Sequence, residues 1–287
     1  MIDAVTQLLV REGLAMKPED INIWYIHCGH WVTMHCTIHG RPSVLVKVAV
    51  CADGALDREA NALQEMRSVI PRHLPQLMAF ENGEALDILV QQYLDIQPLV
   101  LESGGLPQRH RWTTVIGAMA RQTLPESGTN ARRDDIFAGI SQAFPSLEAL
   151  TNRDTETPNL ATLPSIEQHG DFTANNLGFR HGDTPVVYDW EDYGLVDVPG
   201  FDVALLLASF AEFDAIRLED LFLNAKSLHH DDALELVLAS GVEWDTFSYL
   251  LPAYYAIFYW LKGRGAYNPK LQSQCRVLIE ALLQARP

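Results

Sequence analysis

Three polar residues in the second half of the chain have the types and the spacing that phosphoryl transfer needs. Asn176 comes five residues after Asp171, and Asp189 comes eighteen residues after Asp171, at the end of an apolar run. A carboxylate and a side-chain amide offer the hard oxygen ligands that Mg²⁺ prefers. A further carboxylate that holds no metal can orient a hydroxyl group and accept its proton.

The chemistry of a nucleoside triphosphate explains this combination of side chains. Its phosphates are highly anionic, so a divalent cation has to neutralise them and bridge their oxygens. We expect Asn176 and Asp189 to bind that Mg²⁺, and Asp171 to act as the base towards an acceptor hydroxyl. A short loop with Asp171 and Asn176, followed by a hairpin that returns Asp189, would bring the three side chains to one cleft.

Further residues extend this pattern into two motifs. His169-Gly170-Asp171 with Asn176 gives HGDxxxxN, which arises by chance in roughly one chain of this length in a thousand. The second motif begins with Asp189-Trp190-Glu191-Asp192 after the apolar strand. It continues with Gly194, Pro199 and Asp202-Val203-Ala204.

This segment resembles the catalytic loop and the metal motif of the aminoglycoside phosphotransferase and choline kinase family, relatives of the protein kinases. The resemblance implies an α+β, two-lobed protein-kinase-like fold with a small β-rich N-lobe and a larger, mainly helical C-lobe. It implies a phosphotransferase that moves the γ-phosphoryl group of ATP or GTP to an alcohol group of a small molecule, with Mg²⁺ as cofactor. By the resemblance, Asp202 is a structural acid that braces the catalytic loop, and His169 supports the same loop.

The chain repeats the HGD tripeptide at His181-Gly182-Asp183, but there the pattern fails. The fifth residue after Asp183 is Tyr188, not asparagine. Gly, Asp, Thr and Pro in succession are typical of a turn. We therefore exclude this copy from the site and expect it to join strands at 177–180 and 185–188.

A lysine in the first third of the chain fits a phosphate contact. Lys47 lies in the middle of the apolar run Val44–Ala49, and a lysine in such a place needs a partner or an anion. Kinases place a strand lysine on the α- and β-phosphates and hold it with a glutamate of the next helix. Glu59 fits that helix position. The alternative is a lysine on the solvent face of an edge strand.

The other nucleotide contacts are less defined. The segment His27-Cys28-Gly29-His30-Trp31 has one glycine, where the nucleotide loop of protein kinases uses three. The choice between ATP and GTP therefore stays open. We expect Gln92, Tyr93 and Leu94 to form the hinge that meets the base through backbone groups.

Two other groups of residues could suggest a site. The histidines and cysteines between His27 and His39 are numerous, but most lie on predicted strands, whose side chains alternate between faces, and zinc sites use closer pairs. The aromatic residues between Trp244 and Trp260 could box a quaternary ammonium, as in choline kinases. At helical spacing such residues more often form a core, and we favour that interpretation.

The elements that must position these residues change character near residue 97. Before it we expect strands at 22–28, 32–39, 43–50, 76–81 and 87–94, and helices at 2–15 and 57–68. After it we expect helices at 110–123, 133–150, 203–211, 216–228, 231–239, 244–261 and 270–285, around a β-rich island at 177–190. This pattern predicts an α+β fold in two lobes. Residues 1–97 would bind the nucleotide, and residues 98–287 would carry catalysis and acceptor binding.

The amino-acid composition limits the classes of partner that the protein can bind. The chain has 37 acidic and 21 basic residues, a net charge of -16, which repels nucleic acid and anionic membranes and attracts cations. We expect no nucleic-acid or membrane partner and an acceptor that bears an amine. Four cysteines without a CxxC pair favour reduced thiols and a cytoplasmic location. The start lacks a secretory pattern, and the longest late apolar stretch is too short to span a bilayer.

The sequence leaves the acceptor open between an aminoglycoside, a choline-like amine, a sugar and an amino alcohol. The classical aminoglycoside enzymes use acidic groups near the C-terminus, and Gln284–Pro287 is not acidic. An alternative of another class is a catalytically silent nucleotide-binding homologue. The presence of Lys47, Glu59 and all three residues of the predicted metal and base site argues against it.

Overall fold

The computed structural model describes residues 1–28, 31–50, 54–102, 105–122, 131–152, 157–181, 183–264 and 269–285. The chain divides into two compact units. The first unit comprises Met1–Gln97 and Phe179–Tyr193, and the second comprises Pro98–Gly178 and Gly194–Pro287. Asp189 therefore belongs to the first unit, whereas Asp171 and Asn176 belong to the second.

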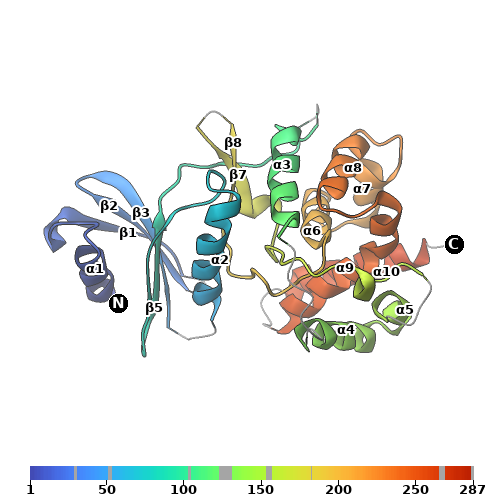
Figure 1. The fold of residues 1–287 in the computed structure, drawn as a ribbon, viewed down its shortest axis with the longest axis horizontal. Coiled ribbons are helices and arrows are strands. Elements are labelled where there is room, and N and C mark those ends of the chain that lie inside the picture. Colours follow the sequence, from blue (N-terminus) through green and yellow to red (C-terminus); the bar gives the residue numbers. More distant parts are fainter. Residues whose placement is uncertain are drawn as a thin grey trace. The chain divides into compact units, whose positions relative to one another are not determined.

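An antiparallel sheet of five strands forms the centre of the first unit (Figure 1), in the order β1-β2-β3-β5-β4. The strands are β1 (Ile21–Cys28), β2 (Val32–Ile38), β3 (Arg41–Ala49), β4 (Leu77–Asn82) and β5 (Asp87–Gln92). The helices of this unit are α1 (Ile2–Arg11), the 3₁₀ turn Pro18–Asp20 and α2 (Ala55–Val69). Since β3 pairs with both β2 and β5, Lys47 lies on a central strand.

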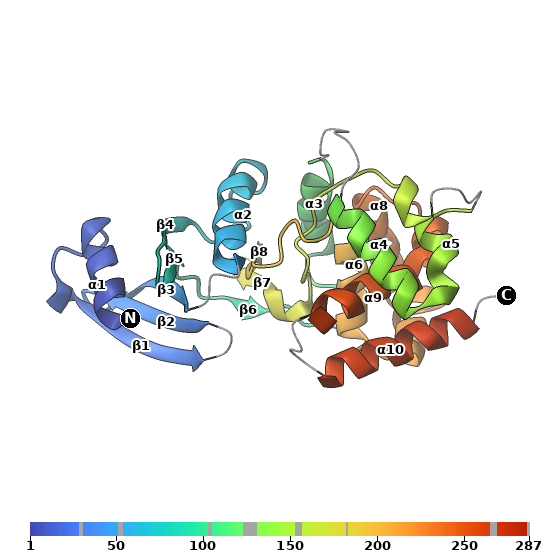
Figure 2. The ribbon, with the colours of Figure 1, turned by 90° about the horizontal axis from the view of Figure 1, so that it is seen from below.

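The alternation of side chains along β3 explains which of them meet α1 and which meet α2. Val46 shares a core cluster with Leu8 of α1, whereas Ala49 shares a different cluster with Leu56 of α2. Figures 1 and 2 show α1 and α2 on opposite sides of the strands. Lys47 has the parity of Ala49, so its side chain extends towards the layer that α2 occupies.

The second unit is mainly helical. Its helices are α3 (Arg109–Ala120), α4 (Ala131–Ala143), α5 (Glu148–Thr151), α6 (Phe201–Phe210), α7 (Ala215–Leu218), α8 (His230–Ala239), α9 (Trp244–Arg264) and α10 (Pro269–Gln284). Its short turns are the 3₁₀ segments Pro145–Leu147, Leu160–Thr162 and Ala174–Asn176, and the π-helical segment Glu219–Leu223. The remaining strands of the chain are β6 (Gln97–Pro98), β7 (Leu177–Arg180) and β8 (Thr184–Val187).

Two apolar helices, α6 and α9, form the core of the second unit. All side chains of α6 from Phe201 to Ala208 are buried, which is typical of a helix enclosed on every side. On α9, Tyr254 and Tyr255 are 0% exposed and Phe258 is 1% exposed. These aromatic side chains belong to the core and have no open face for a quaternary ammonium, in agreement with the interpretation favoured from the sequence.

The structure confirms the α+β class and corrects several element boundaries. The predicted helix 133–150 is two helices, because Pro145 lacks a backbone N–H and restricts the residue before it. The predicted helix 2–15 ends at Arg11, two residues before Gly13, whose φ of +71° is incompatible with a continuing helix. The predicted helix 216–228 is a single α-turn followed by the π-helical segment.

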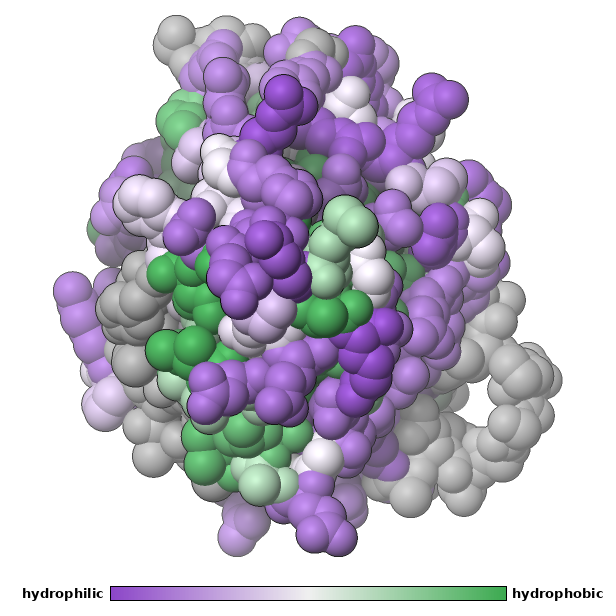
Figure 3. Space-filling model, turned by 90° about the vertical axis from the view of Figure 1, so that its left-hand side faces the viewer, coloured by the Kyte–Doolittle hydropathy of each residue, from purple (hydrophilic) through white to green (hydrophobic). Residues whose placement is uncertain are grey.

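Exposed apolar side chains form separate patches on the face of the molecule that Figure 3 shows. Figure 3 views the molecule from the side where α1 and β1 lie in Figure 1, and hydrophobic patches there lie between hydrophilic residues. The exposed large apolar residues of the first unit are Met1, Ile2, Met16, Trp24 and Val50. Within the described ranges, the helices are too short or too polar to cross a bilayer.

Candidate active site

The catalytic loop predicted from the sequence, residues 169–176, is held by hydrogen bonds to its own backbone. The Asn176 Nδ2 group donates to the Asp171 carbonyl oxygen at 2.9 Å, and the Thr173 N–H donates to the same oxygen at 2.8 Å. Gly170 has a φ of +88°, in the left-handed region that glycine adopts without strain. This turn leaves the Asp171 side chain 22% exposed, so its carboxylate is accessible to a substrate.

A buried carboxylate at the start of α6 fixes the same loop. Asp202 accepts hydrogen bonds from the N–H groups of His169, at 2.8 Å, and Gly170, at 3.1 Å. The buried His169 ring packs edge-on against Phe172, and its Nδ1 accepts the Asp171 N–H at 3.3 Å. Burial raises the pKa of Asp202 to about 7, and the two backbone hydrogen bonds oppose that rise. Asp202 and His169 therefore hold the backbone on which Asp171 lies.

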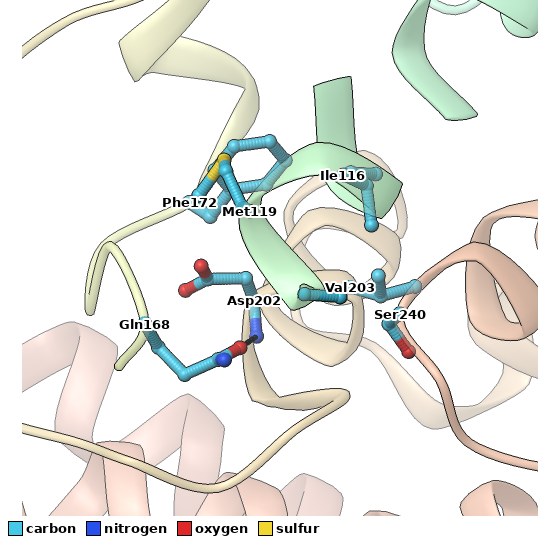
Figure 4. A pocket seen from close by; sticks show the side chains of 8 residues that line it. Ile116, Met119, Gln168, Phe172, Asp202, Val203 and Ser240 are labelled. Atoms are coloured by element: carbon cyan, nitrogen blue, oxygen red, sulfur yellow. Dashed lines mark hydrogen bonds between the residues drawn. The ribbon is translucent and has the colours of Figure 1, made fainter. Parts of the chain in front are cut away.

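A small cavity lies beside Asp202 (Figure 4). Its walls come from Ile116, Met119, Ala120, Gln168, Phe172, Asp202, Val203 and Ser240. The Asp202 N–H donates to Gln168 Oε1 at 3.3 Å across this region, as Figure 4 shows. The volume of about 20 Å³ has room for about one water molecule. The cavity is too small for an acceptor or a nucleotide, so it belongs to the support of the loop.

We expect Asp202→Ala to lower the free energy of unfolding by about 3 kcal/mol. The change leaves two buried N–H groups without an acceptor, and each such loss costs about 1–3 kcal/mol. Urea denaturation followed by circular dichroism measures the difference. Asp220→Ala is the matched control, because Asp220 is exposed in the same unit. Equal effects of the two changes would show that Asp202 does not brace the loop.

In the first unit, Lys47 is the centre of a buried group of charges. Its Nζ donates to Glu59 Oε2 at 2.7 Å and also to the Asp189 carboxylate. The side chains of Lys47 and Glu59 are 6% and 0% exposed, whereas that of Asp189 is 33% exposed. This burial on a central strand rules out a lysine on the solvent face of an edge strand. Asp189 is the member of the group that reaches the surface.

The electrostatics of this group favour a charged lysine and an additional cation. Burial alone would lower the pKa of Lys47, but the carboxylates of Glu59, Asp189 and Glu191 outweigh burial and raise it. Burial and the Asp189 carboxylate together raise the pKa of Glu191 to about 10. Three carboxyl groups thus surround one ammonium. The raised pKa values of Glu59 and Glu191 mean that these two groups tend to keep a proton, and an additional cation nearby would favour their ionised forms.

The donor set fits a divalent metal ion. Glu59, Asp189 and Glu191 each contribute one oxygen, and these oxygens lie within 4.8 Å of one another. Glu59 Oε1 and Glu191 Oε2 are buried and have no hydrogen-bond partner among the described residues. Buried oxygens of this kind need a partner, and carboxylate oxygens are the ligands that Mg²⁺ prefers.

The predicted hinge continues from β5 and is already partly bonded within the chain. The Gln92 N–H donates to the Gln76 carbonyl at 2.8 Å, and the Tyr93 N–H donates to the Ser43 carbonyl at 3.2 Å. Among the hydrogen bonds of the described residues, Leu94 has none through its backbone N–H. Of the three predicted hinge residues, Leu94 therefore keeps its donor for another partner.

The structure collects the predicted site residues in two groups. Lys47, Glu59 and Asp189 meet in the first unit. The second group, in the second unit, contains Asp171, Asn176, His169 and Asp202. Of the predicted nucleotide loop, Gly29 and His30 lie outside the described residues, as does Gly182 of the second HGD. Asp183 lies in the turn between β7 and β8 with a φ of +63°.

Two charged residues near these groups were not assigned a role from the sequence. Glu191 joins the carboxylates of the first unit, and its place two residues after Asp189 in the metal motif was a usable signal. Lys262 Nζ lies 3.4 Å from Asp171 Oδ2. No motif marks Lys262, because it is 91 positions from Asp171 in the sequence and the fold of the second unit brings the two together.

Solved structures share this fold. The GDP and kanamycin complex of APH(2″) matches with a TM-score of 0.64, at 14% identity over 99% of each chain. Spectinomycin phosphotransferase, in complex with ADP and spectinomycin, matches with a TM-score of 0.55, at 12% identity over 99% of this chain and 94% of that one. Ethanolamine kinase from Plasmodium vivax matches with a TM-score of 0.59, at 11% identity over 99% of this chain and 87% of that one.

The family comparison covers both groups of site residues. No curated protein sequence matches the chain. The model of the phosphotransferase enzyme family matches residues 42–236, which is more than half of the chain and includes every predicted site residue from Lys47 to Asp202. The predicted resemblance is thus confirmed: the chain belongs to the phosphotransferase enzyme family.

Proposed function

We propose that the enzyme transfers the γ-phosphoryl group of ATP or GTP to a hydroxyl group of a small, amine-bearing acceptor. The observation that carries this proposal is the buried Lys47–Glu59 ion pair with the Asp189 carboxylate in contact. A buried ammonium fixed beside a partly exposed carboxylate offers both a phosphate contact and a metal ligand. The matched family model supports the same assignment.

Asp189 and Asn176 would hold Mg²⁺, and Glu191 has a buried oxygen without a partner to add to them. When bound there, Mg²⁺ would supply the positive charge that offsets the charge of the triphosphate. Lys47 would contact the α- and β-phosphates, and Glu59 keeps the ammonium in place by its hydrogen bond of 2.7 Å.

Asp171 would orient the acceptor hydroxyl and take its proton. As the acceptor oxygen bonds to the γ-phosphorus, the bond between that phosphorus and the nucleoside diphosphate breaks, and the hydroxyl proton moves to the Asp171 carboxylate. The hydrogen bonds from Asn176 and Thr173 to the Asp171 carbonyl fix the turn that presents this carboxylate. No covalent enzyme intermediate is needed.

The hinge would bind the nucleobase through the backbone. The N–H groups of Gln92 and Tyr93 already donate within the chain, so the Leu94 N–H is the donor that we assign to the base. A single backbone N–H group can donate a hydrogen bond to either adenine or guanine. The proposal therefore includes both ATP and GTP, the nucleotides to which the ADP and GDP of the two structural relatives correspond.

The proposal of an amine-bearing acceptor rests on charge. The net charge of -16 gives the protein a field that concentrates cations. The carboxylates of the helical part are mostly exposed: Glu212, Asp214, Glu219, Asp220, Asp231, Glu235, Glu243 and Asp245. Asp232 is an exception, because it is buried and pairs with Arg109. Exposed carboxylates act at long range and define no binding pocket.

We expect kcat/KM for an amino alcohol acceptor to fall as ionic strength rises. Screening shortens the Debye length to about 8 Å at physiological salt, which weakens the attraction between the protein and a cation. Initial rates at 20 to 500 mM KCl and fixed free Mg²⁺ measure this effect. A neutral sugar is the control and should respond little. The charge argument is refuted if the best acceptor is neutral or anionic.

A panel of acceptors tests the proposed function itself. The purified enzyme is incubated with Mg²⁺, ATP or GTP, and aminoglycosides, choline, ethanolamine or neutral sugars in turn, and phosphate esters are detected by mass spectrometry. At least one alcohol should form a phosphate ester at a rate well above that of nucleotide hydrolysis in water. Ester formation with none of them would favour the catalytically silent homologue.

A further inference from the structure

Lys262, near the C-terminal end of α9, is paired with the predicted base. Its Nζ lies 3.4 Å from Asp171 Oδ2, and both side chains are 22% exposed. The pair is therefore neither buried as a structural ion pair would be nor free in solvent. A substrate that reaches the Asp171 carboxylate also reaches the Lys262 ammonium.

The core of the second unit sets the direction of this lysine. The Lys262 Nζ lies over the ring of Phe258, 5.6 Å from its centroid, one helical turn earlier on α9. Phe258 is buried and stacks on Phe213 at an interplanar angle of 11°. Side chains on a helix lean towards its N-terminus, so a fixed ring at that place supports the lysine stem and aims the ammonium at Asp171.

An ammonium at this place could stabilise the negative charge that develops during phosphoryl transfer. The transferred phosphoryl group carries charge on three equatorial oxygens as it passes to the acceptor oxygen. That acceptor oxygen has to lie within hydrogen-bond reach of Asp171. The loop segment from Asp171 to Asn176 contains no lysine or arginine, so the loop itself supplies no cation to the phosphoryl oxygens.

We infer that Lys262 is a catalytic residue whose ammonium moves from Asp171 to the equatorial oxygens of the transferred phosphoryl group and stabilises their charge. This inference rests on the proposed function, because it takes Asp171 as the base. The flexible four-carbon stem allows the shift, and the starting distance of 3.4 Å places the ammonium beside the carboxylate of the proposed base. Because the Lys262 ammonium repels another cation, the amine of the acceptor has to lie away from the hydroxyl group that reacts.

Lys262→Met is the first test, because methionine retains an unbranched stem over Phe258 and removes the charge. We expect kcat to fall by about 10²- to 10³-fold, the usual effect of losing one donor to a developing anion, with a smaller change in the acceptor KM. Lys262→Arg should recover at least a tenth of the wild-type kcat. Lys270→Met, an exposed lysine on α10, is the control and should keep full activity.

Binding of ADP, or of GDP if GTP is the donor, with aluminium fluoride and Mg²⁺ supplies a readout besides activity. The planar fluoride stands for the transferred phosphoryl group. Lys262→Met should weaken the binding of this complex at least 30-fold while the affinity for the diphosphate alone changes less than threefold. Equal changes for both would overturn the inference. The midpoint of thermal unfolding should stay within about 2 °C, because a partly exposed ion pair contributes little to stability.

A double variant separates a contact with the phosphoryl group from a contact with Asp171 alone. If Lys262 acts on the phosphoryl group, Lys262→Met should slow the residual reaction of Asp171→Asn by a further 10-fold or more. If it only positions Asp171, the double variant and Asp171→Asn should be equally slow, and the inference fails. Failure of the proposed function looks different, because the wild-type enzyme would then form no phosphate ester with any acceptor. Failure of the base assignment alone would leave Asp171→Asn with nearly the wild-type kcat, whatever residue stands at position 262.

Discussion

Asp189→Ala is expected to lower kcat by about three orders of magnitude or more and to abolish Mg²⁺-dependent binding of the nucleotide. A ligated metal supplies several kcal/mol of transition-state stabilisation, and each 1.36 kcal/mol is tenfold in rate. The Asp189 side chain is 33% exposed, whereas that of Glu59 is 0% exposed, so Asp189 is better placed than Glu59 to reach a metal and the phosphates together. The fold should remain, since Lys47 keeps its hydrogen bond to Glu59.

Steady-state rates and nucleotide titrations, with and without Mg²⁺, measure this prediction. The second HGD provides a control with matched backbone strain, because Asp183 and Asp189 have φ angles of +63° and +66°. Alanine is unfavourable in this left-handed region at both positions. Asp183→Ala should therefore share the backbone cost and keep full activity. Asp189→Ala with nearly wild-type rates would refute the assignment.

Asp171→Asn is expected to lower kcat by about 10²- to 10⁴-fold, the range for loss of a general base, and to leave nucleotide binding intact. The amide has nearly the shape of the carboxylate and cannot accept the hydroxyl proton. The backbone hydrogen bonds from Asn176 and Thr173 do not involve the changed atoms, so the loop should keep its form.

Comparison of kcat with the affinity for the nucleotide tests the role of Asp171. A base changes kcat, whereas a residue that only shapes the loop would change the thermal midpoint and the KM for the acceptor as well. The assignment of Asp171 as the base fails if kcat stays within threefold of the wild type. Asp202→Ala serves as the comparison, because it disturbs the support of the loop without removing the base.

The structure contains one pairing that was expected from the sequence, the ion pair between Lys47 and Glu59. The pairing of Lys47 with Glu59 was predictable, because the parity of β3 and the position of the next helix both direct the two side chains to the same layer. The roles proposed for Asp171 and Asn176 rest on a short motif, whose two residues are joined by a hydrogen bond from the Asn176 side chain to the Asp171 carbonyl. These predictions use local geometry only.

Contacts between residues far apart in the chain could not be predicted from this one sequence. Lys262 reaches Asp171 because α9 packs in the core of the second unit, and no pattern near position 262 indicates this contact. The break at Pro145 was predictable from the loss of its N–H, yet the helical periodicity on both sides concealed it. The π-helical segment that follows α7 has no signature in residue type, since it depends on packing.

Single-turnover transfer of a labelled γ-phosphoryl group tests the central claim most directly. Enzyme in excess is mixed with γ-³²P nucleotide, Mg²⁺ and a saturating concentration of the best alcohol from the panel, and samples are quenched over milliseconds to minutes. The account predicts that the label passes from the nucleotide straight to the alcohol, with none on the protein, and that Asp171→Asn slows this step without changing the product. Label that accumulates on the protein, or that appears only as inorganic phosphate, would contradict it.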